Sequence, residues 1–550
     1  MYGKFQPVKL LFCLVGIAVI SGFSGGCSPE QYKADADKEV YQIIDEKWQD
    51  DFGVKANYII SDSNTISSPI DIPVEKVIPP SGVVNLKEAV AIATKYNRTY
   101  KARKETLYRS ALSLTGTRHN YAIKWFGTVD GTYTDDKSSG VDDVEIDGEG
   151  GVQKKSLFLD GVLFNVGIML DWTRFLTGDP RNSLVSILSG DVTIPLLGSG
   201  AGKAAQEDLT QRERQVLYDI RTFNRYRKQF IVDIVDQYYN ILERRANVIN
   251  AENNYKSLLE SKKRLEIEVG TGAKAPSDVD ETEQQLLNAE NSWVRAQQTY
   301  EGALDQFKVT LTLPTDAEIV LDPNELLALE EIGIRQVDYT TEMAIETARQ
   351  WRLDLANSAD YVEDAERKLI LAAEGLGVQL DLWGDTGGPV PYVGIESEPE
   401  NRVGRLQFHE SVYRLGFEAD LPFDRVAERN AYRERLINLE QALREYENDQ
   451  DNIELDMRAA LRDLKAKAEQ YRIQQMALVL AQRRKDTQEM LLSIGQGSTR
   501  LLLDAQSALL RAQNDVTNAL VAHAVAKLGF YRDVGILQVK PDGMWEAKEQ

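Results

Sequence analysis

Apolar residues recur at helical spacing through two long stretches of this chain that contain no proline. The stretches lie between Leu196 and Ala275 and between Phe423 and Lys540. Proline is the strongest breaker of a helix interior, so both stretches are predicted to be very long helices. In the first stretch, apolar positions follow one another at steps of 7, 4, 3, 7, 4 and 7 residues: Leu209, Val216, Ile220, Phe223, Phe230, Ile234 and Ile241. Such a seam, with a period of about 3.5 residues, predicts a left-handed coiled coil.

A pair of glycines interrupts each long stretch, which then resumes as a helix. The pairs are Gly270 with Gly272 and Gly495 with Gly497. Beyond the pairs, an alanine stands at every seventh position: Ala289, Ala296 and Ala303 in the first stretch, and Ala505, Ala512, Ala519 and Ala526 in the second. Small residues along one stripe allow close packing, which favours a wall of helices side by side. The segment 203–269 alone, at 1.5 Å per residue, would form a helix about 100 Å long.

Ahead of each long helix the pattern changes to alternation with a period of two, which predicts β-strands. The segments are "IKWFGTVDGTYTDD", "SLFLDGVLFNVGIMLDW" and "LSGDVTIPLL" in the first half, and "LGVQLDLWGD" and "YRLGFEADLP" in the second. Aromatic residues in them suit the girdle of a membrane-spanning sheet: Trp125, Tyr133, Trp172, Trp383, Tyr413 and Phe417. A small soluble hairpin in each half is the alternative, and the N-terminal signal described below favours the membrane.

Two hairpins supply four principal strands, which are too few to close a barrel, because the smallest membrane barrels have about 8. The chain is therefore expected to associate with copies of itself, so that two copies give eight strands and three give twelve. The segment 155–175 would either add a strand or cover a loop.

The features of the two halves repeat at nearly constant spacing. Pro195 and Pro422 lie 422 − 195 = 227 residues apart, and the glycine pairs lie 495 − 270 = 225 apart. The helices that precede the strands align at 254, for example at Glu88 and Glu342, which leaves 254 − 227 = 27 extra residues in the first hairpin region. This duplication predicts structural repeats at 85–314 and 339–537 and a linker at 315–338. An extended segment at 27–84 precedes them, and a tail at 538–550 follows.

The N-terminus has the organisation of a secretory signal at residues 1–26. Lys4 and Lys9 accompany an apolar core from Leu10 to Ile20, which is too short to span a membrane as a mature helix. The following "SGGCS" resembles a bacterial lipoprotein signal in which Cys27 becomes the lipidated first residue, although Ser24 replaces the usual apolar residue. An ordinary signal peptide is the alternative.

Composition excludes several classes of function. Lys and Arg total 64 against 86 Asp and Glu, a net charge of −22, which disfavours nucleic acid and anionic membrane surfaces as partners. Cys13 lies within the signal, so a mature chain keeps only Cys27. The three histidines are scattered, and no nucleophile, metal site or cofactor motif is visible. We therefore expect no enzyme, no catalytic residues, no cofactor and no bound metal.

Together these residues resemble the TolC-like outer-membrane efflux and secretion channels over roughly 85–537. The matching segments are "IPLLGSGAGK" and "DLPFDRVAER", the tips "VGTGAKAPSDV" and "IGQGSTRLLLDAQ", and the alanine-striped return helices. The resemblance implies a mainly α fold with a β-barrel portion. A long coiled-coil helical tunnel would continue an outer-membrane barrel of twelve strands, which trimerisation completes.

The resemblance also implies roles for particular residues. Pro195 and Pro422 would redirect the chain between strand and helix. A periplasmic adaptor would dock on the helix-to-helix tips: Val269, Gly270, Thr271, Gly272, Ile494, Gly495, Gly497 and Ser498. Asp504 aligns with an acidic gate position whose companion is Leu501 here, and Asp278 and Asp280 could supply further charge; all three could equally be solvated surface carboxylates. The arginine and tyrosine that latch the closed state in the family are replaced by Gly497 and Leu492.

The function that follows is a passive exit duct in a tripartite efflux or type I secretion system. The chain would form a homotrimer in outer-membrane lipid of a Gram-negative-type bacterium and extend into the periplasm. Its partners would be a periplasmic adaptor (membrane fusion protein) and an inner-membrane transporter of the RND, ABC or MFS class. A periplasmic coiled-coil scaffold lipoprotein without a pore is the alternative; it explains the heptads but not the aromatic strands.

Overall fold

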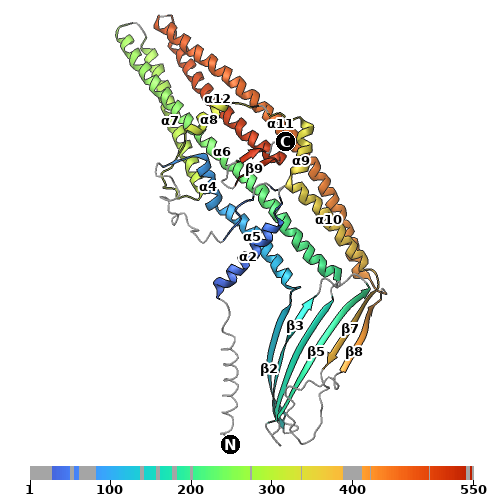
Figure 1. Cartoon of the computed structure of the whole chain (residues 1–550). Helices are drawn as coiled ribbons and strands as arrows, with labels where there is room; N and C mark the ends of the chain where they lie inside the picture. Colours follow the sequence, from blue (N-terminus) through green and yellow to red (C-terminus); the bar gives the residue numbers. More distant parts are fainter. Residues whose placement is uncertain are drawn as a thin grey trace, which may run out of the picture.

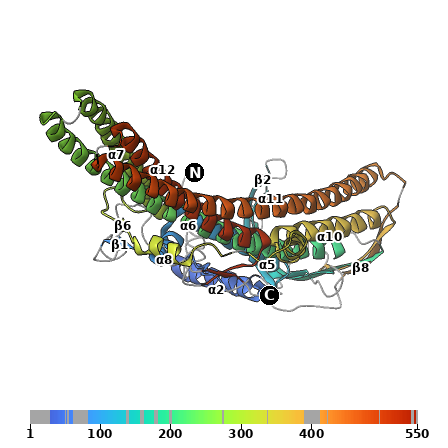
Figure 2. The same cartoon turned by 90° about the horizontal axis from the view of Figure 1, so that it is seen from above.

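The chain folds into a long bundle of helices with a β-sheet at one end. The computed structural model describes residues 28–49, 52, 55–60, 82–136, 141–155, 162–175, 182–197, 202–272, 275–335, 337–387, 412–421, 423–494, 496–540 and 545–547. Two helix pairs extend away from the sheet and end in tips at the far end of the molecule, as Figures 1 and 2 show from two sides.

The helices repeat in matched pairs along the chain. In the first half they are α4 (Leu86–Tyr96), α5 (Arg98–His119), α6 (Gly202–Gly270) and α7 (Pro276–Leu311). Their counterparts are α9 (Thr341–Trp351), α10 (Leu353–Glu374), α11 (Val426–Ser493) and α12 (Thr499–Val534). The lengths agree closely, at 11, 22, 69 and 36 residues against 11, 22, 68 and 36. The very long helices predicted from the absence of proline are therefore present in both halves.

The helix caps correct the alignment of the two halves by one residue. Asn85 caps α4 and Thr340 caps α9, and each side chain accepts a hydrogen bond from the backbone N–H three residues later. These positions differ by 340 − 85 = 255, not by the 254 predicted from residue identities. Ala89 and Ala344 obey the corrected spacing, and both are fully buried. The spacing of 255 residues is therefore correct, because it aligns the buried positions of the two helices. Glu88 and Glu342 are the same residue type but do not occupy equivalent positions.

The coiled-coil seam of α6 lies in the core as predicted. Val216, Ile220 and Ile234 are fully buried, and α6 packs along α5, α7, α10 and α12. The alanine stripes face neighbouring helices: Ala289, Ala505 and Ala512 are buried, and the other four alanines are half-buried. Small side chains on these stripes let the helices approach closely.

The sheet contains six strands instead of the four principal strands predicted. They are β2 (Lys124–Asp136), β3 (Val141–Lys155), β4 (Leu163–Phe175), β5 (Asn182–Leu197), β7 (Gln379–Gly387) and β8 (Val412–Asp420). Their order is β2-β3-β4-β5-β7-β8 with every neighbouring pair antiparallel, so β2 and β8 form the edges. The segment 155–175 thus adds a strand, β4, to the sheet. The first half contributes four strands and the second half two.

The segment predicted to be extended at 27–84 contains a helix, α2 (Pro29–Lys47). Ser28 and Gln31 form a capping box at its start, and Val40, Ile43 and Ile44 bury one face. Helix α2 packs on α5 and α6, because its short apolar stripe finds a partner surface there. That stripe covers a single turn, which is too little periodicity for the sequence to reveal.

The linker and the tail also contain regular structure. In the linker, β6 (Val320–Leu321) pairs with β1 (Val83–Val84) and α8 (Asn324–Ile332) follows. In the tail, β10 (Trp545–Ala547) pairs with β9 (Leu537–Val539). Pairing with distant strands organises segments that lack a pattern of their own. Within the described residues, no helix is both long enough and apolar enough to cross a membrane.

Candidate functional site

The sheet has one apolar face, which the strand register assembles from all six strands. Residues directly opposite one another on neighbouring strands share a face, and alternate residues of a strand face opposite sides. The register places Trp125, Val152, Val166 and Tyr413 in one row across the sheet. The same face carries these further apolar side chains: Val129, Tyr133, Val144, Ile146, Phe164, Val192, Ile194, Leu380, Leu382, Leu415, Phe417 and Ala419.

Much of this apolar face is open to solvent in the single chain. Trp125 is 81% exposed, Leu415 75% and Phe417 66%. Among the side chains described on this face, Lys154 alone is charged. An exposed apolar surface of this kind marks contact with lipid or with another protein.

The opposite face of the sheet is polar and strongly acidic. Its described carboxylates are Asp130, Asp143, Glu145, Asp147, Glu149, Asp191, Asp381, Asp385, Glu418 and Asp420. Against these ten acids stand two cations, Lys124 and Arg414, and Arg414 Nε lies 3.0 Å from Asp385 Oδ1. The excess of negative charge attracts cations to this face and repels anions. In "DDVEIDGEG", acidic residues alternate with apolar residues or glycine, and this pattern indicates the acidic face from the sequence. The predicted site residues did not include the acidic residues of this segment.

The aromatic residues predicted to form one girdle are divided between the two faces. Trp125, Tyr133, Tyr413 and Phe417 lie on the apolar face. Trp383 lies on the polar face, where a Cβ at Gly416 would be 2.6 Å from its Cζ2 atom. The ring of Trp383 covers the backbone of Gly416 on the neighbouring strand, so the ring has an apolar surface to pack on although it lies on the polar face. The side chain of Trp172 lies outside the described residues.

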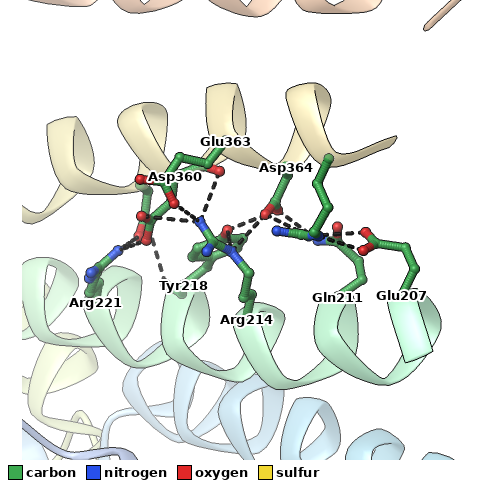
Figure 3. Close-up of polar contacts among 10 residues, drawn as sticks. Glu207, Gln211, Arg214, Tyr218, Arg221, Asp360, Glu363 and Asp364 are labelled. Carbon is green, nitrogen blue, oxygen red and sulfur yellow. Dashed lines mark hydrogen bonds and ion pairs between the residues drawn. The ribbon is translucent and has the colours of Figure 1, made fainter. Parts of the chain in front are cut away.

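A polar network joins the two halves where α6 packs against α10 (Figure 3). The Asp364 carboxylate of α10, which is 5% exposed, lies at its centre. Arg214 Nε lies 2.6 Å from Asp364 Oδ1, the Tyr218 hydroxyl donates to Asp364 Oδ2 at 2.8 Å, and Gln211 Nε2 donates to the same oxygen at 2.9 Å. Further ion pairs flank this centre: Arg221 with Asp360, Arg214 with Glu363, and Arg367 with Glu207.

The network fixes the charge of Asp364. Burial by itself raises the pKa of its carboxyl, but hydrogen bonds from Gln211, Tyr218 and Arg367 and the charge of Arg214 lower that pKa below its ordinary value. The α6 residues of the network follow one another at steps of 4, 3, 4 and 3: Glu207, Gln211, Arg214, Tyr218 and Arg221. This polar stripe is visible in the sequence, but its partner helix is not.

At the far end of the helices, the two tips differ in how they turn. In the first tip, Thr271 and Gly272 donate backbone hydrogen bonds to Ile267 and Val269, and Gly272 has a φ of +78°. In the second tip, a Cβ on Gly497 would lie 2.5 Å from the backbone N of Leu492. A side chain at position 497 is therefore excluded by the turn, which gives a physical reason for the glycine where the resemblance implies a latching arginine.

Several exposed apolar residues surround the tips. Ile267, Met490, Ile494 and Leu501 are each between 46% and 70% exposed. Behind the tips, an apolar cluster of Leu258, Leu286, Ala289 and Leu503 joins the helical hairpin α6–α7 to the helical hairpin α11–α12. Arg500 Nε and Glu281 Oε1, 3.9 Å apart, form an ion pair between the hairpins at the surface.

The remaining predicted site residues have the following positions. Pro195 lies inside β5 beside a register shift at Pro195/Leu197, and α6 begins at Gly202. Asp278 is half-buried in the first turn of α7, while Asp280 and Asp504 are exposed. Gly270 ends α6 at the surface, and Ser498 precedes α12. Cys27, Pro422 and Gly495 lie outside the described residues. The structure separates the gate candidates from the acidic face by the length of the long helices (Figure 1).

Comparison with known proteins identifies the fold. No family model matches the sequence, and no curated protein matches it. Solved outer-membrane channels share the fold at low identity. The Campylobacter jejuni CmeC outer membrane channel is 15% identical with a TM-score of 0.59, and the match covers 84% of this chain and 87% of that one. The outer membrane protein VceC from Vibrio cholerae is 11% identical with a TM-score of 0.59, covering 82% of this chain and 96% of that one.

The open state of the Neisseria gonorrhoeae MtrE outer membrane channel also shares the fold. It is 12% identical with a TM-score of 0.57, and the match covers 82% of this chain and 88% of that one. The chain therefore has the TolC-like fold of outer-membrane channels, in which long helices continue from a β-sheet portion. The predicted fold class is confirmed at this level.

Proposed function

We propose that this chain is one subunit of an outer-membrane channel that serves as a passive exit duct. The observation that carries the proposal is the sheet with one apolar and one acidic face, joined to helices of 69 and 68 residues. With its apolar face toward lipid, the sheet would turn its polar face toward an aqueous lumen. The helices would then extend the lumen by about 100 Å into the periplasm.

Closure of the channel requires more than one copy, because a sheet with two open edges leaves backbone groups unpaired in lipid. We propose a homotrimer, in line with the resemblance to TolC-like channels. Substrates would come from an inner-membrane transporter through a periplasmic adaptor that docks on the helix tips. The exposed apolar residues Ile267, Met490 and Ile494 at these tips support such a docking surface.

Reconstitution of the full-length protein tests the channel. Purified protein in detergent should run as a trimer that heating dissociates, and it should give step conductances in a planar bilayer. A water-soluble monomer that never inserts would contradict the proposal and favour the periplasmic scaffold. Export of a dye from cells that express the matching pump and adaptor would then test the tripartite system.

Attachment through Cys27 is a separate part of the proposal. Globomycin, which blocks the lipoprotein signal peptidase, should cause the precursor to accumulate. Cys27→Ser should abolish labelling with radioactive palmitate. Normal processing in the presence of globomycin would indicate an ordinary signal peptide and would leave the channel proposal intact.

A further inference from the structure

The first half of the sheet contains one antiparallel pair of strands that has no counterpart in the second half. Strand β2 begins five residues after the end of α5, 124 − 119, and β7 begins five residues after the end of α10, 379 − 374. Strand β5 leads into α6 as β8 leads into α11. By the repeat, β2 corresponds to β7 and β5 corresponds to β8. The extra residues of the first half therefore form β3 and β4.

The extra pair is part of the wall of the sheet. Strand β3 pairs with β2 along Lys124–Asp136 and with β4 over thirteen residue pairs, and β4 pairs with β5 over twelve. Both faces continue through the pair: Val144, Ile146 and Val152 extend the apolar face, and Glu145 and Asp147 extend the acidic face. If β3 and β4 folded into the lumen or over a loop instead, their apolar and acidic residues would not need to continue the two faces of the sheet.

The repeat also predicts how neighbouring copies would meet. Within the chain, β5 ends the first half and pairs with β7, which begins the second half. The corresponding contact would join β8 to the β2 strand of a second copy. Six strands that alternate in direction leave β8 antiparallel to that β2, so the contact has the same polarity as every other pair in the sheet.

The register of this contact follows from the same correspondence. Val192 on β5 lies opposite Gly384 on β7. Adding the 227-residue spacing to Val192 gives Ala419, and subtracting the 255-residue spacing from Gly384 gives Val129. Ala419 and Val129 both lie on the apolar face, so the contact joins apolar face to apolar face and acidic face to acidic face.

We propose that β8 of each copy pairs with β2 of the next copy, so that three copies close a barrel of eighteen strands instead of twelve. This inference rests on the proposed trimeric channel. With strands about 4.8 Å apart and tilted by about 40°, eighteen strands give a diameter of roughly 36 Å between backbone centres, and twelve give roughly 24 Å.

The wider barrel would be an open aqueous mouth. Barrels of 16 to 18 strands leave a water-filled channel, whereas side chains fill barrels of about 8 strands. The acidic face of the sheet would line this mouth.

Cysteine cross-linking of the full-length protein in membranes tests the contact. Ala419→Cys should be combined in turn with Trp125→Cys, Val129→Cys and Tyr133→Cys, all on the apolar face of β2. Oxidation should join copies most strongly for Val129, giving covalent dimers and trimers and no larger species, because a disulfide requires Cα atoms within about 7 Å. Each single-cysteine variant is the matched control for Cys27.

Three results would overturn the proposal while leaving the channel function in place. The first is a conducting trimer in which no β2 cysteine joins Ala419→Cys. The second is an electron cryomicroscopy reconstruction of the wild-type trimer that shows twelve strands, with β3 and β4 outside the wall. Cross-links that stop at the dimer would also overturn it. A protein that fails to insert or conduct in the wild-type form would instead contradict the proposed function itself.

Discussion

Arg214 Nε on α6 lies 2.6 Å from Asp364 Oδ1 on α10, and this ion pair joins the two halves of the chain. Its surroundings are largely closed to water, with Arg214 23% exposed and Asp364 5% exposed. The pair therefore connects the long helix of one repeat to the short helix of the other. Its rupture should loosen the helical wall close to the sheet.

Asp364→Ala should destabilise the folded chain strongly. The substitution leaves the Arg214 guanidinium and the Tyr218 hydroxyl without their shared partner, and the loss of one partner of a buried pair costs about 3 to 5 kcal/mol. Thermal unfolding followed by circular dichroism should show a lower Tm. Glu363→Ala is the matched control, because the Glu363 side chain is 63% exposed although it also pairs with Arg214. Equal losses in both variants would contradict the central role of Asp364.

Acidification should remove the contribution of Asp364. Its pKa is lowered in the folded state, so its stabilisation is present above the ordinary carboxyl pKa and is lost as the pH falls through the folded-state pKa. Tm measured from neutral pH down to pH values below about 4 should therefore fall, and it should fall less steeply in Asp364→Asn. Glu213 and Asp354 also have lowered pKa values and account for part of the remaining slope. Identical slopes in the two proteins would count against this assignment.

Adjacent residues of β2 should respond oppositely to a charge. Val129 lies on the apolar face and Thr128 on the acidic face. Val129→Lys should impair insertion, because a lysine facing lipid near the bilayer midplane costs about 2 to 4 kcal/mol, whereas Thr128→Lys should insert. The fraction of protein that forms heat-sensitive trimers in the outer membrane measures the effect. Equal insertion of both variants would show that the apolar face does not contact lipid.

Neutralisation of the acidic face should reduce the preference of the pore for cations. Glu145, Asp147 and Glu149 follow one another on the polar face of β3. The triple variant Glu145→Gln, Asp147→Asn and Glu149→Gln should shift the reversal potential in a salt gradient toward zero. Ile146→Val, on the opposite face of the same strand, is the control and should leave the potential unchanged. An unaltered reversal potential in the triple variant would place the selectivity elsewhere.

Two glycines at the tips should differ in their tolerance of alanine. A Cβ at Gly497 would lie 2.5 Å from Leu492 N, whereas a Cβ at Gly270 meets nothing within 4 Å. Gly497→Ala should force the second tip open and increase hydrogen exchange at 490–498, while Gly270→Ala should leave exchange at the first tip unchanged. If adaptor docking uses the tips, only Gly497→Ala should reduce export. Equal exchange in both variants would show that the second turn can absorb the methyl group.

Local patterns made most of the helical architecture predictable. The absence of proline and the seam through Val216, Ile220 and Ile234 depend on sequence neighbours, and the structure contains the corresponding helices. The strands of the second half were predicted for the same reason. Helix α2 was missed because its stabilisation comes from burial of Val40, Ile43 and Ile44 against α5 and α6, which are distant in sequence.

The sequence by itself determined the duplication, the long helices and the alternation that makes two-faced strands, because each is a periodic local property. Only the tertiary structure decided that β3 and β4 belong to the sheet, because strand pairing joins residues that no local pattern connects. It also decided that Trp383 faces the acidic side and that Asp364 meets Arg214. Register and helix contact depend on how distant segments pack, and packing is settled only when the whole chain folds.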